Sequence, residues 1–112
     1  PGLLDWELAH LGDPHDDLGW ALLPDMTGLT DRLFGVMERS EVYERYEAGS
    51  GVRIDPAAID YYSVLALFKL ACICQSGLHM FAVGGSNDVR ALMLSSQGGT
   101  VMRQLAKLAE RT

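Results

Sequence analysis

The feature that most constrains the fold is a long apolar segment, residues 57–83, which follows an Asp-Pro pair. Asp55 can cap a helix, and Pro56 suits the first helical position because the N–H that it lacks would have no helical partner there. Residues 61–74 are apolar nearly all round, and a helix of that kind is normally buried at the centre of its domain. The segment therefore predicts a mainly helical fold built around one core helix.

A membrane span is the alternative interpretation of this segment. Lys69, Gln75 and His79 interrupt it, and the uninterrupted apolar stretch is shorter than the roughly 20 residues that a bilayer requires. We therefore expect a buried helix in a cytoplasmic protein.

Capping residues and glycines predict further, shorter helices along the chain. Their expected starts are Asp16 or Asp17, Thr27 or Thr30, Ser40, and Asn87, and the second of them should extend as far as Met37. A last helix follows Gly99 and has Val101, Leu105 and Leu108 on its inward side.

Length and charge limit the classes of protein to which this chain can belong. The chain has 112 residues, 48% of them hydrophobic, which is enough for one compact domain. The formal net charge of -6 and the lack of a Lys/Arg run disfavour nucleic-acid binding. Cys72 and Cys74 are two apart on a helix and point to different faces, so we expect reduced, buried thiols and neither a disulfide nor a shared zinc site.

Acidic and histidine side chains, which can bind a metal or transfer a proton, are concentrated in residues 3–18. Their sequence is Leu-Leu-Asp-Trp-Glu-Leu-Ala-His-Leu-Gly-Asp-Pro-His-Asp-Asp-Leu. Leu3-Leu4 can be the end of a short strand, which would place the carboxylate of Asp5 at its end. Magnesium takes oxygen ligands and is often held by one or two carboxylates, with phosphate oxygens and water completing its shell. An acid in this position can therefore hold a cation, although a lone Asp more often ends a strand and caps a turn.

The order of these residues resembles the metal-binding segment of the aminoglycoside phosphotransferase and choline kinase-like family. In that family two apolar residues precede Asp-Trp-Glu, and Gly-Asp-Pro and Asp-Leu follow. The resemblance implies that Asp5 holds the magnesium that bridges the phosphates of ATP or GTP, as the Asp of Asp-Phe-Gly does in protein kinases. The implied reaction transfers the terminal phosphate to a small-molecule hydroxyl group.

The resemblance extends over most of the chain and is nearest to the branch associated with acyl-CoA dehydrogenases. It includes Tyr46, Gly51, Pro56, Tyr61-Tyr62 and Leu67-Phe68-Lys69. It implies a mainly α fold, the C-terminal helical lobe of a protein kinase-like (α+β) fold with a short N-terminal strand. Residues 1–112 would form this one subdomain, with the metal-binding segment at 3–18 and a helical substrate-side region at 19–112.

The parts of a kinase-like site that precede the metal-binding segment in the family are not in this sequence. These are the catalytic loop, with its Asp and Asn, and a Lys that binds the phosphates. Only four residues precede Asp5, and the chain begins with Pro1-Gly2. We therefore expect a C-terminal piece of a longer enzyme, without a catalytic residue of its own, inactive alone, and partnered by an N-terminal lobe of the same protein.

Structural roles are expected for most other polar residues of the segment. Asp13 and Asp17 suit turn and capping positions better than support of a metal. Glu7 is expected to be solvated rather than to reach the metal through water. His10 and His15 are expected to be turn or surface residues, because magnesium prefers oxygen ligands.

Two further side chains have expected positions near the site. Trp6 should pack behind Asp5 and fix its direction. Lys69 should extend from the core helix and pair with an acid, in preference to contacting a substrate. The spacing leaves open which of four residues line an acceptor pocket: Tyr43, Tyr46, Tyr62 or His79.

Two other functions remain open. The His15-Asp16 doublet is typical of HD-type metal-dependent phosphohydrolases, whose mixed ligands suit a transition metal. That family also needs a separate upstream His and a distant Asp, and His10 is too close to serve as the former. The last alternative is a non-catalytic helical interaction module, in which the acids are solvated caps and magnesium nucleotide does not bind.

Overall fold

The structure, a computed structural model, describes residues 2–23, 32–83 and 89–110. It is mainly helical, as expected, with one short two-stranded sheet. In chain order the elements are the 3-10 helix η1 (Trp6–Leu8), α1 (His15–Ala21), β1 (Arg32–Leu33), β2 (Met37–Glu38), α3 (Arg39–Ser50), α4 (Pro56–Ala82), α5 (Val89–Ser96) and α6 (Gly98–Ala109).

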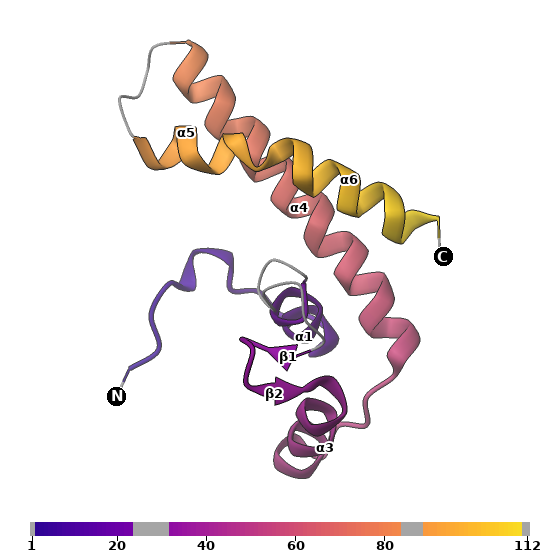
Figure 1. The fold of residues 1–112 in the computed structure, drawn as a ribbon. Coiled ribbons are helices and arrows are strands. Elements are labelled where there is room, and N and C mark those ends of the chain that lie inside the picture. The colour runs from indigo at the N-terminus through magenta and orange to yellow at the C-terminus, as the bar shows by residue number, and fades with distance from the viewer. Residues whose placement is uncertain (1, 24–31, 84–88, 111–112) are drawn as a thin grey trace.

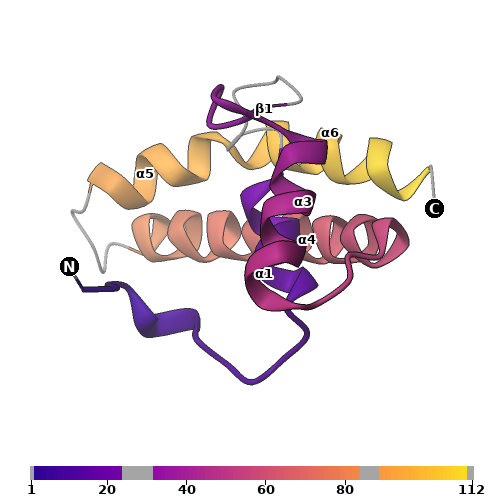
Figure 2. The ribbon, with the colours of Figure 1, turned by 90° about the horizontal axis from the view of Figure 1, so that it is seen from below.

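Helix α4 is the element on which the others assemble. It contacts α1, α5 and α6, and the last two follow one another along it (Figure 1, Figure 2). Its start is the predicted one, since Pro56 is the first helical residue and the Asp55 carboxylate accepts a hydrogen bond of 2.9 Å from the backbone N–H of Ala57. The sequence prediction of a core helix that begins at this pair is confirmed.

Burial of α4 is confined to one side. The buried residues recur at helical spacing: Ile59, Ser63, Ala66, Leu67, Ala71, Cys74 and Gly77. Phe68 and Phe81 on the same helix are exposed, so the expectation of a helix buried all round was wrong. By length and composition alone α4 is also able to cross a membrane, although the same holds for core helices of soluble proteins.

Two groups of buried side chains hold the fold together. One joins Leu23 and Val101 to the middle of α4, and Leu105 and Leu108 of α6 pack against it. This confirms the inward face predicted for the last helix. The other group joins Leu18 of α1, and Leu22 directly after that helix, to residues of α3 and to the start of α4. One cluster therefore ties α6 to the middle of α4, and the other ties α1 and α3 to its start.

The helix predicted from Thr27 or Thr30 to Met37 is wrong in its described part. Residues 32–38 form a hairpin instead, in which Arg32 pairs with Glu38 and Leu33 with Met37. Phe34 and Gly35, at the turn, have φ of 50° and 73°, a left-handed conformation that no right-handed helix contains. The remainder of that prediction, and Asn87 as a cap, lie outside the described residues.

The expected strand at Leu3-Leu4 is absent from the described structure. A strand requires a hydrogen-bonded neighbour. Within the described parts of the chain, both strands belong to the hairpin and pair with each other. Leu3 and Leu4 instead have no regular secondary structure and are exposed.

Candidate functional site

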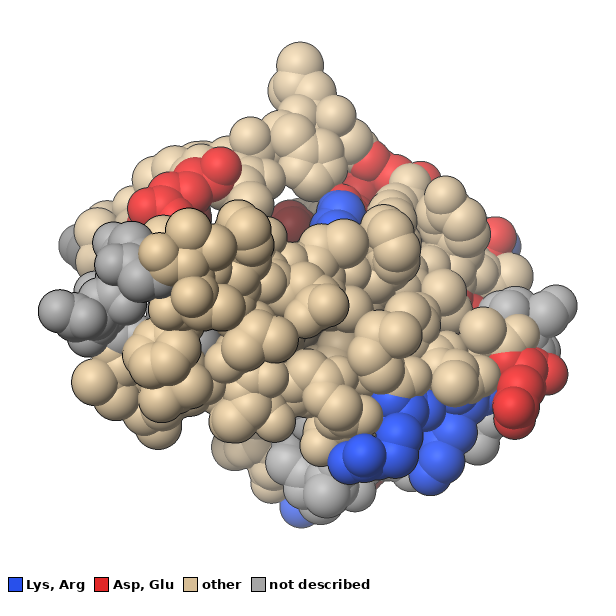
Figure 3. All heavy atoms as spheres, turned by 90° about the horizontal axis from the view of Figure 1, so that it is seen from above, with Lys and Arg blue, Asp and Glu red and all other residues tan. Residues whose placement is uncertain are grey.

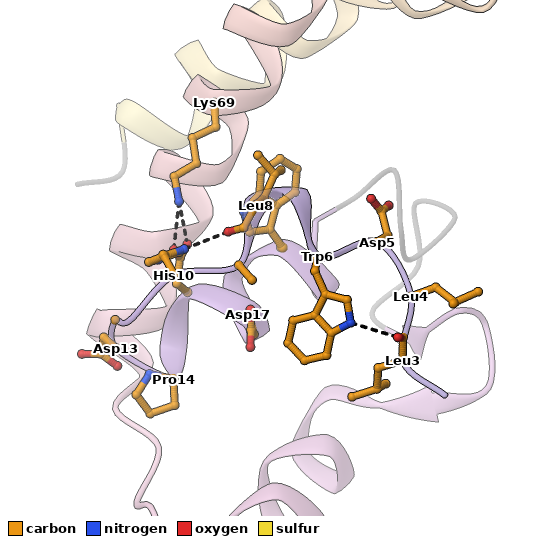
Figure 4. A pocket seen from close by; sticks show the side chains of 14 residues that line it. Leu3, Leu4, Asp5, Trp6, Leu8, His10, Asp13, Pro14, Asp17 and Lys69 are labelled. Carbon is orange, nitrogen blue, oxygen red and sulfur yellow. Dashed lines mark hydrogen bonds and ion pairs between the residues drawn. The ribbon is translucent and has the colours of Figure 1, made fainter. Parts of the chain in front are cut away.

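A cleft of about 830 Å³ lies between the N-terminal segment, α1 and α4. We use the name N-terminal segment for residues 2–12. Figure 4 shows the lining side chains, with Lys69 and Asp5 on different sides of the cleft. The lining residues are Leu3, Leu4, Asp5, Trp6, Leu8, Ala9, His10, Gly12, Asp13, Pro14, Asp16, Asp17, Trp20 and Lys69. The structure thus brings most of the motif at 3–18 to one place.

The N-terminal segment forms one wall of the cleft and is itself exposed. Trp6 is 65% exposed, and its indole Nε1 donates a hydrogen bond of 2.9 Å to the carbonyl oxygen of Leu3 (Figure 4). Trp6 therefore does not pack in a core behind Asp5, contrary to the expectation. Its hydrogen bond instead closes a local turn around Asp5.

Asp5 has an unusual backbone conformation for a residue with a side chain. Its φ of 66° and ψ of 57° are left-handed, and it precedes η1 without a capping hydrogen bond from its carboxylate. Such a conformation costs roughly 1 kcal/mol in a residue other than glycine, although Asp tolerates it better than most. Asp5 is one of the residues that line the cleft.

The best-connected acid of the cleft is Asp16, in the first turn of α1. It is 5% exposed, and its Oδ2 lies 2.8 Å from the Lys69 ammonium and 3.1 Å from His10 Nε2. Lys69 also donates to Asp16 Oδ1 over 3.2 Å. The prediction that Lys69 pairs with an acid is confirmed. Asp16, expected as a possible helix cap or as half of an HD-type doublet, is the buried partner in this network.

A second network links the start of α1 to the start of α4. The carboxylate of Asp13 accepts hydrogen bonds from the backbone N–H of His15 and from its ring Nδ1. His15 Nε2 accepts a hydrogen bond of 3.1 Å from the backbone N–H of Asp55. Because Nε2 accepts, Nδ1 carries the proton. The turn role of Asp13 is confirmed, whereas His15, expected at a turn or on the surface, is buried at the start of α1.

These hydrogen bonds make the stability of the fold depend on the charge of Asp13. The backbone N–H of His15, and then its side chain, lower the pKa of Asp13 from the ordinary value of 3.8. A lowered pKa stabilises the fold above the ordinary value, and this stabilisation is lost as the pH falls through the folded-state pKa.

We expect Asp13→Asn to remove this dependence, because the amide oxygen still accepts hydrogen bonds but carries no charge. The wild-type protein should exceed the variant in free energy of unfolding at pH 7, and the difference should shrink below about pH 4. Urea denaturation at a series of pH values measures it. A difference that stays constant down to about pH 3 would show that the charge of Asp13 is not involved.

The aromatic pair on α4 lies beside these networks. The rings of Tyr61 and Tyr62 meet edge to face, with centroids 5.1 Å apart. Burial, and then the charge of Asp13, raise the pKa of Tyr62. The lining of the cleft includes none of Tyr43, Tyr46, Tyr62 and His79, so the residues left open as acceptor contacts do not contribute to this cleft. It includes Trp20 of α1, for which the sequence predicted no site role.

Among the described residues, no group of three or more His, Cys, Asp and Glu side chains could hold a metal ion. Both cysteines are free thiols. Cys74 is buried as expected, but Cys72 is exposed because it falls on the outer side of α4.

Comparison of the chain with protein-family models, with curated proteins and with solved structures gives no match.

Proposed function

We propose that this chain is the C-terminal, helical part of a kinase-like phosphotransferase, an enzyme that moves the terminal phosphate of ATP or GTP to the hydroxyl group of a small molecule. The proposal rests on the resemblance of residues 3–18 to a magnesium-binding segment. The structural observation that best supports it is that one cleft is lined by four acids spread over this segment: Asp5, Asp13, Asp16 and Asp17.

In this proposal Asp5 is the magnesium ligand. Its carboxylate offers hard oxygen donors, it is not used as a helix cap, and it lines the cleft. Magnesium is compatible with so few protein ligands, because phosphate oxygens and water complete its shell. The left-handed backbone of Asp5 also supports a functional role, since such conformations concentrate at functional sites. Bound there, magnesium would neutralise charge on the transferred phosphate.

The rest of the chain has a positioning role in the proposal. The Asp16–Lys69 ion pair fixes α1 relative to α4, and α1 carries Asp17 and Trp20 into the cleft. A preceding lobe of the same protein would supply the catalytic Asp and the phosphate-binding Lys. Such an enzyme would be cytoplasmic.

The test of the proposed site is nucleotide-dependent metal binding. In the natural protein that contains this chain, Mn²⁺ used as a spectroscopic substitute for Mg²⁺ should bind at least tenfold more weakly in Asp5→Asn than in wild type when ATP is present, a loss of about 1.4 kcal/mol. Electron paramagnetic resonance measures the free Mn²⁺. Glu7→Gln is the matched control, because Glu7 is an exposed acid two residues away that does not line the cleft, and it should bind as wild type does.

The same experiment separates the proposal from a non-catalytic helical module. A module whose acids are solvated caps would bind no Mn²⁺ with ATP, and Asp5→Asn would then behave as Glu7→Gln does. Equal binding by both variants would contradict the assignment of Asp5.

The HD-type phosphohydrolase is less well supported by the geometry. Both ring nitrogens of His15 already have protein partners, in Asp13 and in the backbone of Asp55. Asp16, the other half of the doublet, is bonded to Lys69. Binding a metal at this doublet would break these contacts.

A further inference from the structure

The side of α4 that faces solvent carries a regular line of side chains. Successive positions on it are alternately four and three residues apart, a spacing that keeps them on one side of a helix. We call this line the outer stripe. Its members are Tyr61, Leu65, Phe68, Cys72, Gln75 and His79, all of them exposed except the half-buried Leu65. One helix packs along another through positions with this spacing.

The part of the outer stripe nearer the start of α4 is apolar. Tyr61 is 61% exposed and Phe68 is 56% exposed, although side chains of this size contribute most when they are buried. Leu65 lies between them, and the Cys72 thiol one turn later behaves as a small apolar group. The midpoint of these four positions falls between residues 66 and 67. Exposed apolar side chains that follow one another along a helix indicate a contact with another molecule.

Charged groups are sparse around the outer stripe. Figure 3 shows that the surface over α4, α5 and α6 is largely free of them. Within α4 the acidic and basic side chains are Asp60 and Lys69, and Lys69 is paired with Asp16. The net charge of -6 therefore has little on this face with which to repel a second copy of the chain. A face without charge also offers no complementarity to a charged partner, and the interfaces of homodimers are the more apolar ones.

We propose that α4 of one copy packs antiparallel against α4 of a second copy along the outer stripe, which gives a symmetric dimer. A two-fold axis at the midpoint of the four apolar positions places Tyr61 opposite Cys72 of the other copy, and Leu65 opposite Phe68 of the other copy. Every apolar position then meets an apolar position, and Gln75 lies outside the contact. A parallel pair would instead place Gln75 against Gln75 along the same line. The inference does not depend on the proposed phosphotransferase activity.

The size of the contact sets the expected strength of the dimer. The apolar positions span about 16 Å of helix, and a pair of helices over that length buries less than the roughly 800 Å² per partner of a standard interface. The dimer should therefore be weak, with a Kd on the order of 10 μM, and should exchange with the monomer.

Sedimentation equilibrium of the full chain at about 1 to 300 μM measures this association. The mass should rise from 12.2 kDa toward twice that value as the concentration increases. Phe68→Glu places a charge beside the two-fold axis and should raise the Kd at least about tenfold. Phe34→Glu is the matched control, because it is the same change at a phenylalanine that is 67% exposed but lies in the hairpin turn, and it should keep the wild-type Kd. Circular dichroism verifies that both variants are folded.

Cross-linking with a short bismaleimide tests the orientation of the two helices. In the antiparallel pair the two Cys72 thiols are about 16 Å apart along the helices, so wild type should not cross-link, whereas Tyr61→Cys places a thiol opposite Cys72 of the other copy and should cross-link as a dimer. Adding Cys72→Ser to Tyr61→Cys should abolish the product.

Two results would overturn the proposed dimer. The first is a wild-type chain that stays monomeric over the whole concentration range. Such a chain that also binds phosphatidylcholine vesicles would show that the outer stripe contacts a membrane surface instead. The second is cross-linking of wild type through Cys72, which would show that the helices pair in parallel.

Discussion

Gly19→Ala should destabilise the protein by about 2 kcal/mol, although alanine normally favours a helix. At Gly19, α1 lies directly against the backbone of α4. A Cβ atom at this position would lie 2.8 Å from the carbonyl carbon and from the Cβ of Tyr62, and 3.0 Å from the backbone nitrogen of Ser63. Backbone atoms of a helix cannot move aside as the end of a flexible side chain can. The two helices would have to separate.

The same substitution at Gly49 is the matched control. Gly49 lies in α3, and a Cβ atom at this position would have no neighbouring atom within 4 Å, so Gly49→Ala should stabilise the protein by about 0.5 kcal/mol through helix propensity alone. Urea denaturation measures the free energy of unfolding of both variants and so compares the two substitutions. A Gly19→Ala protein as stable as Gly49→Ala would show that α1 does not cross α4 at this distance.

Lys69→Met should cost about 2 kcal/mol of stability, because it removes the cation that bonds both oxygens of the nearly buried Asp16. His10 would remain 3.1 Å away as the other partner of that carboxylate. The methionine preserves the apolar stem, so the loss reports on the charge and not on packing. Free energies of unfolding from urea titration measure the loss.

Two comparisons isolate this ion pair. Adding Asp16→Asn to Lys69→Met should recover part of the lost stability, since the unpaired charge is then gone. Arg45→Met is the control for an exposed pair: Arg45 and Glu41 are one helical turn apart on α3, and the change should cost less than about 0.5 kcal/mol. If Lys69→Met cost no more than Arg45→Met, the Asp16–Lys69 pair would have no greater structural role than a surface pair.

The elements that were predicted correctly have local causes. The start of α4 follows from the cap at Asp55 and the proline after it, and the end of α3 follows from Gly51, whose φ is 72°. The inward face of α6 follows from apolar side chains at helical spacing. In each case residues within a few positions of one another are sufficient to determine the structure.

The predictions that failed depend on contacts distant in sequence or on backbone conformation. Leu33 and Met37 fit a helical spacing, but the left-handed Phe34 and Gly35 make a hairpin. The burial of His15 could not be predicted, because its ring accepts a hydrogen bond from the backbone N–H of Asp55, 40 positions away in the sequence. Cys72 is exposed because it lies on the side of α4 that the neighbouring helices do not cover.

The candidate site was predictable in part. The motif at 3–18 identified the segment that lines the cleft, and the pairing of Lys69 with an acid was expected. The identity of that acid, Asp16, required the packing of α1 on α4. Trp20 also reaches the cleft only because of this packing, since its place on the helical pattern is that of a core residue.

The exposed face over α4, α5 and α6 is largely free of charged groups (Figure 3). Exposed apolar residues on α4 and α5 include Leu78, Met80, Phe81, Leu92 and Met93. An apolar surface of this kind raises the tendency to associate. Measurements on the protein should therefore be made over a range of concentrations.

An assay of phosphate transfer is the most direct test of the proposed phosphotransferase function. The natural protein that contains this chain would be incubated with ATP, Mg²⁺ and a panel of small hydroxyl compounds, and the products followed by phosphorus nuclear magnetic resonance. We expect a new phosphomonoester signal that requires Mg²⁺ and disappears in Asp5→Ala, while that variant stays folded. Full activity in a folded Asp5→Ala protein would contradict it.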